Sequence, residues 1–404
     1  MGIIVQKYGG TSLANPERIK SVAGRVIETK KRGNDVVVVV SAMGDTTDEL
    51  ISLYKKISDN PSERERDMLL STGEQVSCAL LSMAIHSRGY KALSFTGAQA
   101  GIITDGVYSK ARILQINSRK ILKELKKNKV VIIAGFQGVN INSEITTLGR
   151  GGSDTTAVVL AAGLKAELCE IYTDVEGVFT TDPRIVTGAK KLKSISYDEM
   201  LELASLGAKV LHPRAVECAK EYKLPLVVRS SFSRKEGTVI LPKESIEKER
   251  PVTGIACDKS AAKISILSVP DRPGVAAQLF SNLAKSNINV DMIIQNIRRG
   301  RVNDISFTVS REDLKRAVEI TKRVAKKLKA DEVLFDRNAA KVSIVGAGMT
   351  SRPGVASEMF HALARAGVNI DMISTSEIKV SCLIEAKDSD KAVRSLHKRF
   401  GLSK

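Results

Sequence analysis

Apolar runs and helix-like stretches alternate along the first half of the chain. Residues 36–40 are five consecutive valines, and 129–134 and 168–172 are similar apolar runs. Such runs are typical of strands that are buried on both faces of a parallel sheet. Helical patterns lie between them, one from Asn15-Pro16 to Lys31 and one over 63–88. The alternation predicts an α/β domain in which a mostly parallel sheet lies between two helical layers. Further predicted strands cover residues 3–8, 92–96 and 227–232.

Small and polar residues stand at the carboxyl ends of these predicted strands. Lys7 closes the first strand, Ser41 follows the valine run, and Phe136-Gln137 and Thr173-Asp174 follow two later strands. In open α/β sheets ligands bind outside the carboxyl ends of the strands. We therefore expect these side chains to converge on one crevice.

A glycine turn, Gly149 to Gly152, precedes the Ala-rich apolar stretch 157–164. Ser153 and Asp154 are suitable cap and first-turn residues for a helix over that stretch. A glycine turn before a helix N-terminus presents free N–H groups and a positive dipole end to a phosphate. A tight turn that merely caps a helix is the alternative. The first strand is followed neither by a Walker-type P-loop nor by a Gly-x-Gly-x-x-Gly motif, so phosphate-binding glycines are distributed among separate loops.

The last third of the chain contains an internal repeat. Residues 271–276 match 351–356, and 289–293 match 369–373, both at an offset of 80, while the preceding strands 262–266 and 340–344 are offset by 78. Each copy has the pattern strand, Pro-Gly turn, amphipathic helix, strand, strand, helix, strand. The pattern predicts two α+β, ferredoxin-like βαββαβ domains, each with a sheet covered on one side.

Composition adds limits on the class of protein. A length of 404 residues favours two or three domains. The net charge of +18 suits either nucleic acid or anionic small substrates, but the basic residues lie along helix-like stretches with few aromatics, which argues against nucleic acid. The five cysteines are scattered without a Cys-x-x-Cys pair, as in a cytoplasmic enzyme. The longest apolar runs are too short to span a membrane.

Four motifs, taken in their order along the chain, resemble those of a known protein family. They are Lys7-Tyr8-Gly9-Gly10-Thr11-Ser12, 149–156, 172–178 and Thr181-Asp182-Pro183-Arg184. Together they resemble the aspartate kinases of the amino acid kinase family, and the two C-terminal copies resemble ACT domains, small amino-acid-sensing modules. The resemblance implies a catalytic domain over 1–245, a linker and entry strand over 246–262, and ACT domains over 263–338 and 339–404.

The resemblance implies transfer of the γ-phosphoryl group of ATP to the side-chain carboxylate of L-aspartate, which gives 4-phospho-L-aspartate. An aspartate side chain is already ionised at neutral pH, so the reaction needs no general base. It needs cations and N–H groups that stabilise charge on the transferring phosphoryl group. By resemblance, Lys7 bridges that group, and Asp154 holds the lysine and the metal–phosphate assembly in place.

The resemblance also implies two groups of binding residues. Arg150 pairs with the α-carboxylate of aspartate and Glu74 with its ammonium group, and the rest of this pocket is formed by Thr47, Phe136 and Ser153. The nucleotide contacts are implied to come from Lys7, Tyr8, Gly9, Gly10, Ser41, Thr173, Asp174, Phe179, Asp182, Arg184 and Lys209. Asp182-Pro183 has a second interpretation as a plain turn. Mg²⁺ is expected to accompany ATP with few protein ligands, without a metal site of its own.

Feedback regulation by lysine, threonine or both is the further implication. One effector site is implied to include Asp271, Gly274, Ala276 and Gln295, with Asn369 and Ile370 of the second copy. Asn289, Val290 and Asp291 are implied to face Ala356 and Ser376 in a second site, where some relatives carry Thr in place of Ala356. The enzyme would then begin the biosynthesis of lysine, threonine, methionine and diaminopimelate. It would assemble as a homo-oligomer or as an α2β2 complex with a separate regulatory subunit.

Two alternatives remain at this point. One is another amino acid kinase, acting on glutamate or acetylglutamate, which the combination of Arg150 and Glu74 disfavours. The other is an amino-acid-responsive nucleic-acid regulator, for which the sequence offers no helix-turn-helix or similar reader.

Overall fold

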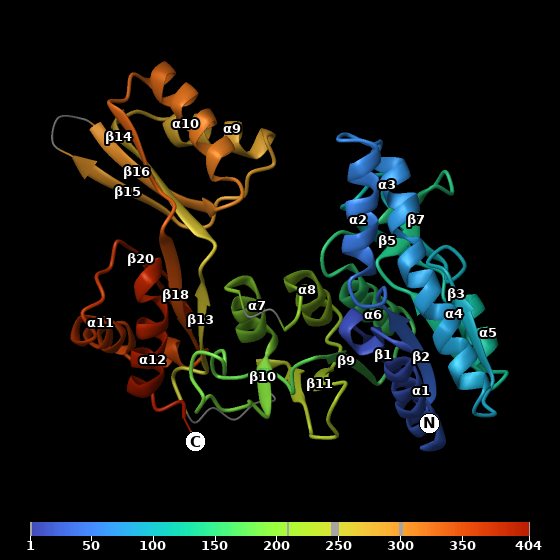
Figure 1. The fold of residues 1–404 in the computed structure, drawn as a ribbon. Coiled ribbons are helices and arrows are strands. Elements are labelled where there is room, and N and C mark those ends of the chain that lie inside the picture. The colour runs from blue at the N-terminus through green and yellow to red at the C-terminus, as the bar shows by residue number, and fades with distance from the viewer. Residues whose placement is uncertain (1, 208–209, 244–249, 299–301, 404) are drawn as a thin grey trace. The chain divides into compact units, whose positions relative to one another are not determined.

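The computed structural model describes residues 2–207, 210–243, 250–298 and 302–403 (Figure 1). The chain forms two compact units, each of which is described by itself. Unit 1 comprises Met1–Val178, Lys191–Ser205 and Lys209–Glu247, and unit 2 comprises Phe179–Lys190, Leu206–Ala208 and Lys248–Lys404.

An eight-stranded sheet forms the centre of unit 1, in the order β10-β12-β11-β9-β1-β2-β6-β3. All pairs are parallel except β11 with β12, so the mostly parallel sheet that the sequence predicts is confirmed. In sheet order, the strands are β10 (Ser194–Ser196), β12 (Thr238–Leu241), β11 (Leu226–Ser230), β9 (Leu168–Thr173), β1 (Ile3–Tyr8), β2 (Asp35–Val40), β6 (Val130–Ala134) and β3 (Ala92–Phe95).

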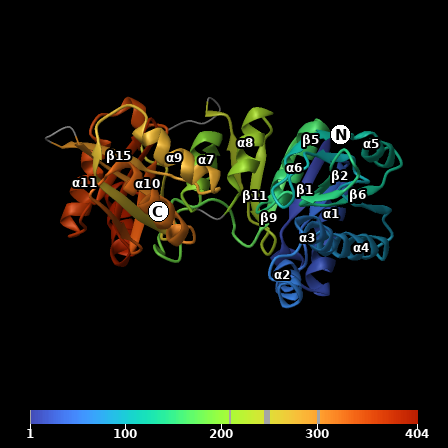
Figure 2. The same cartoon turned by 90° about the horizontal axis from the view of Figure 1, so that it is seen from above.

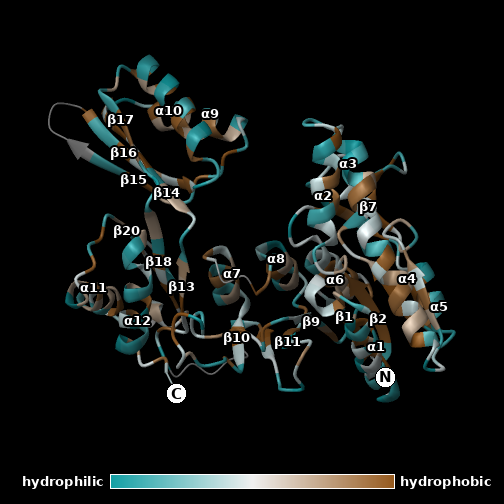
Figure 3. Ribbon diagram, in the orientation of Figure 1, coloured by the Kyte–Doolittle hydropathy of each residue, from teal (hydrophilic) through white to brown (hydrophobic). Residues whose placement is uncertain are grey.

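Helices cover both faces of this sheet. On one face, α1 (Pro16–Lys31) and α4 (Thr72–His86) pack together and share a core with alternate residues of β1, β2 and β6 (Figure 2). On the other face, α6 (Gly152–Gly163) packs on β1, β2 and β9, and α8 (Pro213–Glu221) packs on α6. The strands appear as apolar ribbons between these helices (Figure 3). Asn15 caps α1 as predicted, since its side chain accepts a hydrogen bond from the Arg18 N–H. The remaining helices of unit 1 are α2 (Thr46–Ile57), α3 (Glu63–Leu70), α5 (Arg119–Leu125) and α7 (Tyr197–Ser205).

The structure adds a small second sheet to unit 1 that the sequence pattern does not predict. Its order is β5-β4-β7-β8, and the β7–β8 hairpin connects Phe136 to the glycine turn. The bounds are β4 (Ile102–Thr104), β5 (Ile113–Ile116), β7 (Gln137–Val139) and β8 (Ile145–Thr147).

The helical pattern over 63–88 forms two helices, α3 and α4, which meet at Ser71. The stretch Glu63–His86 is long and apolar enough, by composition, to cross a membrane. Half of it is buried inside the protein, however, and Leu81 and Ile85 lie in the core beneath the sheet. Burial accounts for one side of the stretch, whereas Met68, Val76 and Met83 are exposed.

Two four-stranded antiparallel sheets form unit 2. The first repeat contains β14 (Ala261–Pro270), α9 (Val275–Lys285), β15 (Ile293–Arg298), β16 (Val302–Ser310), α10 (Leu314–Leu328) and β17 (Glu332–Asp336). The second repeat contains β18 (Ala339–Val345), α11 (Val355–Arg365), β19 (Met372–Ser376), β20 (Lys379–Glu385) and α12 (Ser389–Arg399). The orders are β15-β16-β14-β17 and β13-β18-β20-β19, and each repeat has its own apolar core. The ferredoxin-like arrangement is thus present in both copies.

One strand of the second sheet comes from a part of the chain that was not expected to belong to it. Its fourth strand is β13 (Gly254–Asp258), which precedes the first repeat in the chain and pairs with β18. The sequence pattern assigned this stretch to a linker and entry strand. Its apolar residues are buried because Ile255 belongs to the core of the second repeat. The first repeat is therefore inserted between two strands of the second.

Candidate active site

The carboxyl ends of four neighbouring strands meet at one edge of the large sheet. β9, β1, β2 and β6 are adjacent and parallel, and backbone hydrogen bonds continue beyond their ends. The Ser41 N–H donates to the Tyr8 carbonyl (3.1 Å), and the Gly9 N–H donates to the Tyr172 carbonyl (3.2 Å). The loops after the strands therefore stay side by side, so the chain positions of Lys7, Ser41, Phe136 and Thr173 lie along one edge of the sheet.

An ion pair between Lys7 and Asp154 lies at this edge. The Lys7 Nζ atom is 2.6 Å from the Asp154 Oδ1 atom, and each side chain is only 12% exposed. Asp154 belongs to the first turn of α6, so a cation and a helix N-terminus meet at one place. The arrangement concentrates positive charge and N–H donors where an anion would bind.

The side chain of Tyr8 lies on the opposite face of the sheet from Lys7. It is fully buried and stacks on Tyr172, with ring centroids 4.6 Å apart and an angle of 9° between the planes. Burial also raises the pKa of the Tyr8 hydroxyl well above its usual value. A nucleotide contact at Tyr8 would therefore come from its backbone, because the side chain is buried on the other face of the sheet.

The glycine turn packs directly against the start of α8. Gly151 caps α6 with φ 71°, and a Cβ atom there would lie 2.2–2.5 Å from the His212 ring. Only glycine fits such a position. The Arg214 Nη1 atom donates to the Leu148 carbonyl (2.9 Å), which fixes the strand end before the turn. The turn thus holds Arg150, which is exposed, and Ser153, which is buried, in a defined backbone.

A second close approach joins the Gly9-Gly10 loop to the loop after β2. A Cβ atom on Gly10 would lie 2.9 Å from the carbonyl oxygens of Ala42 and Gly44. The Gly44 N–H donates to the Gly10 carbonyl (3.0 Å). Backbone rather than side chains therefore lines this part of the edge, as a phosphate-binding cradle requires.

Phe136 has an unusual backbone conformation for a bulky residue. Its φ is 68°, in the left-handed region that large side chains rarely adopt. The Phe136 N–H donates to the Thr156 hydroxyl (3.2 Å), and its carbonyl accepts from the Leu148 N–H (2.8 Å). Strain of this kind persists where surrounding contacts enforce it and is common at functional sites.

Glu74 is a buried carboxyl group with an unused oxygen. Its Oε1 atom accepts a weak hydrogen bond from the Ala42 N–H (3.3 Å), whereas Oε2 has no partner among the residues that the structure describes. Burial raises the pKa of Glu74 to about 8. The residue lies in the first turn of α4, beside the loop that carries Ser41 and leads to Thr47 at the start of α2. An ammonium group would supply the missing partner.

Asp67 is a supporting residue that the sequence did not reveal. It is fully buried on α3 and accepts four hydrogen bonds of 2.7–2.9 Å, two from Ser109 and two from Thr147. These bonds tie α3 to β8, the strand before the glycine turn. In the sequence Asp67 ends a run of charged residues that resembles a solvated helix face, so composition gave no signal.

The remaining nucleotide candidates are placed in different parts of the chain. Thr173 ends β9 and Asp174 follows it, and the Thr173 hydroxyl donates to the Asp174 Oδ1 atom (3.0 Å). Phe179, Asp182 and Arg184 belong to unit 2. Lys209 lies outside the described residues.

The implied effector residues are spread over unit 2. Asp271 accepts a hydrogen bond from Asn303 (2.9 Å), Gly274 caps α9, Ala276 lies in its first turn, and Gln295 is on β15. Val290 packs on the core of the first repeat, and Ile370 and Ala356 pack on that of the second. Asn289 and Ser376 are exposed.

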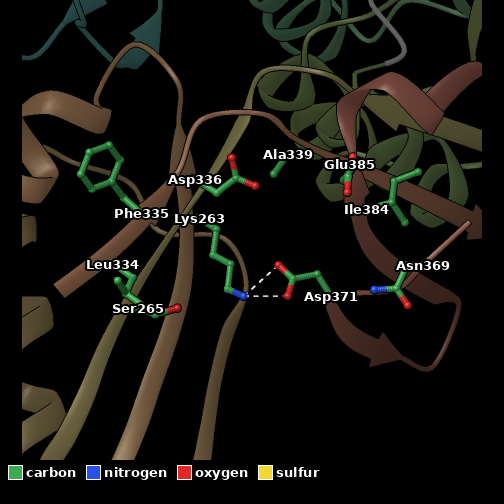
Figure 4. A pocket seen from close by; sticks show the side chains of 10 residues that line it. All are labelled: Lys263, Ser265, Leu334, Phe335, Asp336, Ala339, Asn369, Asp371, Ile384 and Glu385. Carbon is green, nitrogen blue, oxygen red and sulfur yellow. Dashed lines mark hydrogen bonds and ion pairs between the residues drawn. The ribbon is translucent and has the colours of Figure 1, made fainter. Parts of the chain in front are cut away.

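Reciprocal ion pairs link the two repeats. Lys263 of β14 pairs with Asp371 (2.8 Å), and Lys341 of β18 pairs with Asp291. Asn369 lies beside the first pair, in a cavity of about 350 Å³ between the repeats (Figure 4). Its lining residues do not include Asp271, Gly274, Ala276 or Gln295, so this cavity is not the implied first effector site.

The residues that the structure describes contain no group of three or more His, Cys, Asp or Glu side chains that could hold a metal ion. A Mg²⁺ ion at this edge would therefore take most of its ligands from phosphate and water, which this ion accepts readily.

The comparisons with known proteins agree on one family. The amino acid kinase family matches residues 2–230, and the ACT domain matches 264–323 and 342–400. The aspartokinase of Bacillus sp. (strain MGA3) is 54% identical over 403 residues, which cover 100% of this chain and 98% of that protein. Aspartokinase 2 of Bacillus subtilis (strain 168) is 54% identical over 404 residues, which cover 100% and 99%.

Solved structures show the same relationship. Aspartokinase III of E. coli in complex with aspartate and ADP has a TM-score of 0.82 at 26% identity, over 99% of this chain and 100% of that one. The same enzyme in complex with lysine and aspartate has a TM-score of 0.75 at 27% identity, over 98% and 99%. The aspartate kinase of Synechocystis is 51% identical, with a TM-score of 0.56 over 98% of this chain and 69% of that one.

Proposed function

The chain belongs to the aspartokinases of the amino acid kinase family, and from that premise we propose how its residues divide the reaction among them. The enzyme uses ATP to phosphorylate the side-chain carboxylate of aspartate. The observation that carries the assignment of roles is the Lys7–Asp154 pair, which lies where four parallel strand ends meet a helix N-terminus.

Lys7 is the catalytic cation in this proposal. The attacking carboxylate and the transferring phosphoryl group are both anionic, so the chemistry requires a fixed positive charge and not a base. Asp154 holds the ammonium group in place through the 2.6 Å contact. The N–H groups at the start of α6 and the backbone of Gly9-Gly10 add donors that need no reorganisation during the reaction. Mg²⁺ bound with ATP would neutralise phosphate charge.

The aspartate pocket is proposed to form between the glycine turn and the start of α4. Arg150 would bind the α-carboxylate through its planar fork. Glu74 would bind the ammonium group, which would satisfy its unpartnered oxygen. Thr47, Phe136 and Ser153 would complete the pocket. Ser41, Thr173 and Asp174 would contact the nucleotide, together with Phe179, Asp182, Arg184 and Lys209 by resemblance.

The two ACT repeats are proposed to make the enzyme responsive to lysine, threonine or both. Aspartokinase III of E. coli has been solved with lysine bound, which shows that a relative of this fold binds such a ligand. Inhibition requires that the effector bind two states of the enzyme with different affinity. We extend the proposal to a cytoplasmic oligomer that begins the biosynthesis of the aspartate-derived amino acids.

An ATP-dependent hydroxamate assay on the full chain tests the substrate and the effectors together. We expect turnover with aspartate and none above background with glutamate or acetylglutamate. Adding lysine, threonine and their mixture should reduce the rate in at least one of the three cases. Turnover with glutamate but not aspartate would refute the proposed substrate, and a rate indifferent to all three additions would refute the proposed regulation.

The Asp271→Ala substitution should weaken inhibition without loss of activity. Asp271 is exposed at the turn before α9 and is held by Asn303, so its removal leaves the core of the first repeat intact. We expect the inhibitory concentration of the active effector to rise at least tenfold, with kcat within twofold of wild type. Asp313→Ala removes the same charge from the start of α10 in the same repeat and serves as the control. Equal inhibition of both variants and the wild type would exclude Asp271 from the effector site.

A further inference from the structure

Residues 179–190 lie between two segments of unit 1 in the sequence but are built into the second repeat of unit 2. The Ile255 N–H of β13 donates to the Thr180 carbonyl (2.8 Å). The Arg394 Nε atom of α12 donates to the Ile185 carbonyl (3.1 Å), and Ala189 forms a β-bridge with Ser403. The segment is thus fastened to the second repeat near both of its ends and in its middle.

The Thr180 hydroxyl is the buried centre of these contacts. Thr180 is 4% exposed, and its Oγ1 atom lies 3.0 Å from the Nε2 atom of His397, which is 1% exposed. The same oxygen accepts a hydrogen bond from the Lys190 N–H (3.0 Å), which links the two ends of the segment. The Nδ1 atom of His397 lies 3.4 Å from the Ser403 hydroxyl. Burial lowers the pKa of His397, so the ring is neutral at pH 7 and suits a hydrogen-bonded core position.

The tip of the segment is ordered by its own hydrogen bonds. The Asp182 carbonyl accepts the N–H groups of Ile185 and Val186 (3.0 and 3.1 Å). The Asp182 carboxylate accepts the Arg184 N–H (2.9 Å) and pairs with its guanidinium (2.7 Å). Ile185 and Val186 pack against the core of the second repeat. The positions of Asp182 and Arg184 therefore depend on the integrity of that repeat.

We propose that Thr180 and His397 are positioning residues for nucleotide binding: they hold the segment that carries Phe179, Asp182 and Arg184 in its binding conformation. The inference rests on the proposed function, which assigns those three residues to the nucleotide. It gives the second repeat an indirect role in ATP binding, through the conformation of residues 179–190. Coupling between two binding events is reciprocal, so any ligand that shifts α12 or β13 changes the affinity for ATP, and ATP changes the affinity for that ligand.

Two variants test the inference in the full chain. Thr180→Val removes the hydroxyl but keeps the shape, and His397→Leu removes the ring nitrogens. We expect each to raise KM for ATP about tenfold, while KM for aspartate and kcat stay within twofold of wild type. Hydrogen exchange measured by mass spectrometry should become faster in the peptide that covers 179–190. His397→Gln, whose amide can still bond the Thr180 hydroxyl, should restore most of the affinity for ATP.

A matched control separates positioning from general loss of stability. Ser343 and Ser381 form a buried cross-strand hydrogen bond of 2.7 Å between β18 and β20 of the second repeat, and neither side chain bonds to residues 179–190. Ser343→Ala should lower Tm by a similar amount and leave KM for ATP unchanged. The inference is overturned if 179–190 exchanges faster while KM for ATP is unchanged, if its exchange does not respond to either variant, or if the control raises KM equally. Wild-type enzyme that fails to turn over aspartate would instead refute the proposed function.

Discussion

Replacing Lys7 with methionine should lower kcat by about a thousandfold and leave the fold intact. Loss of one preorganised group that stabilises transition-state charge typically costs two to three orders of magnitude. Here the cation is held at 2.6 Å from Asp154 and both side chains are only 12% exposed, so water screens the charge weakly. Methionine keeps the length of the side chain and removes only the charge and its donors. Steady-state kinetics with saturating ATP and aspartate measure the loss.

The control for this substitution is Lys30→Met. Lys30 pairs with Asp35 at 2.8 Å, and its side chain is 11% exposed, so the pair matches Lys7–Asp154 in length and in lysine burial. It lies at the opposite end of the sheet, because Asp35 begins β2. Both variants should lose similar stability, seen as a similar fall in Tm, but only Lys7→Met should lose turnover. A kcat within tenfold of wild type for Lys7→Met would remove Lys7 from the catalytic role.

The parts of the site that follow from local sequence pattern could be predicted. The valine run over 36–40 specifies a strand buried on both faces, and such strands lie in parallel sheets whose carboxyl ends share one edge. That rule alone places Lys7, Ser41 and Phe136 together. The residues 271–276 and 289–293 that recur as 351–356 and 369–373 likewise predict two copies of one fold. In each case a short stretch of chain carries the information.

The parts that depend on distant partners could not be predicted. Gly151 must be glycine because the His212 ring, from α8, occupies the space of its Cβ atom. Asp67 is buried because Ser109, from a loop, and Thr147, from β8, reach it. β13 completes the second sheet across the whole first repeat. Each of these facts is set by tertiary packing between segments that no periodicity connects.

Tyr8 shows that a resemblance to a family motif also leaves side-chain positions undetermined. The motif around it identifies the phosphate-binding loop, but it does not say which face of the strand each side chain occupies. Alternation along β1 sends Lys7 towards α6 and Tyr8 towards the core on the other face. The motif therefore marks the strand correctly while only its backbone and Lys7 remain available to a ligand.

Replacing Glu74 with glutamine should raise KM for aspartate about a hundredfold and leave KM for ATP within twofold. Glutamine keeps the volume and the hydrogen bond from the Ala42 N–H but cannot carry the charge that the substrate ammonium needs. Removing one partner of a buried charge pair costs several kcal/mol, which agrees with an effect of this size. Glu124→Gln is the control, because Glu124 lies on α5 and pairs with Lys127 and Lys129.

The pH dependence provides an independent test of the same residue. With a pKa of about 8, Glu74 is mostly protonated at neutral pH in the free enzyme, and only the ionised form binds an ammonium group well. KM for aspartate should therefore fall as pH rises, by roughly tenfold per unit below the pKa, and level off above pH 8. Glu74→Gln should abolish this slope. A wild-type KM that is constant from pH 6.5 to 8.5 would show that Glu74 does not bind the substrate as a carboxylate.

The stability of the free enzyme should fall as pH rises, whereas its affinity for aspartate should rise. The pKa of Glu74 is raised from 4.5 in the unfolded chain to about 8 in the folded one, so the folded state binds more protons between these values. The free energy of unfolding should then fall by roughly 1.4 kcal/mol per pH unit across that window, relative to Glu74→Gln. The variant should thus be more stable than wild type at pH 8 and similar to it near pH 4.5, measured by chemical denaturation. Adding aspartate should reduce the difference at pH 8, because the bound ammonium group stabilises the ionised carboxylate in the wild type only. The buried charge of Glu74 would thus lower the stability of the free enzyme and raise the affinity of the enzyme for aspartate.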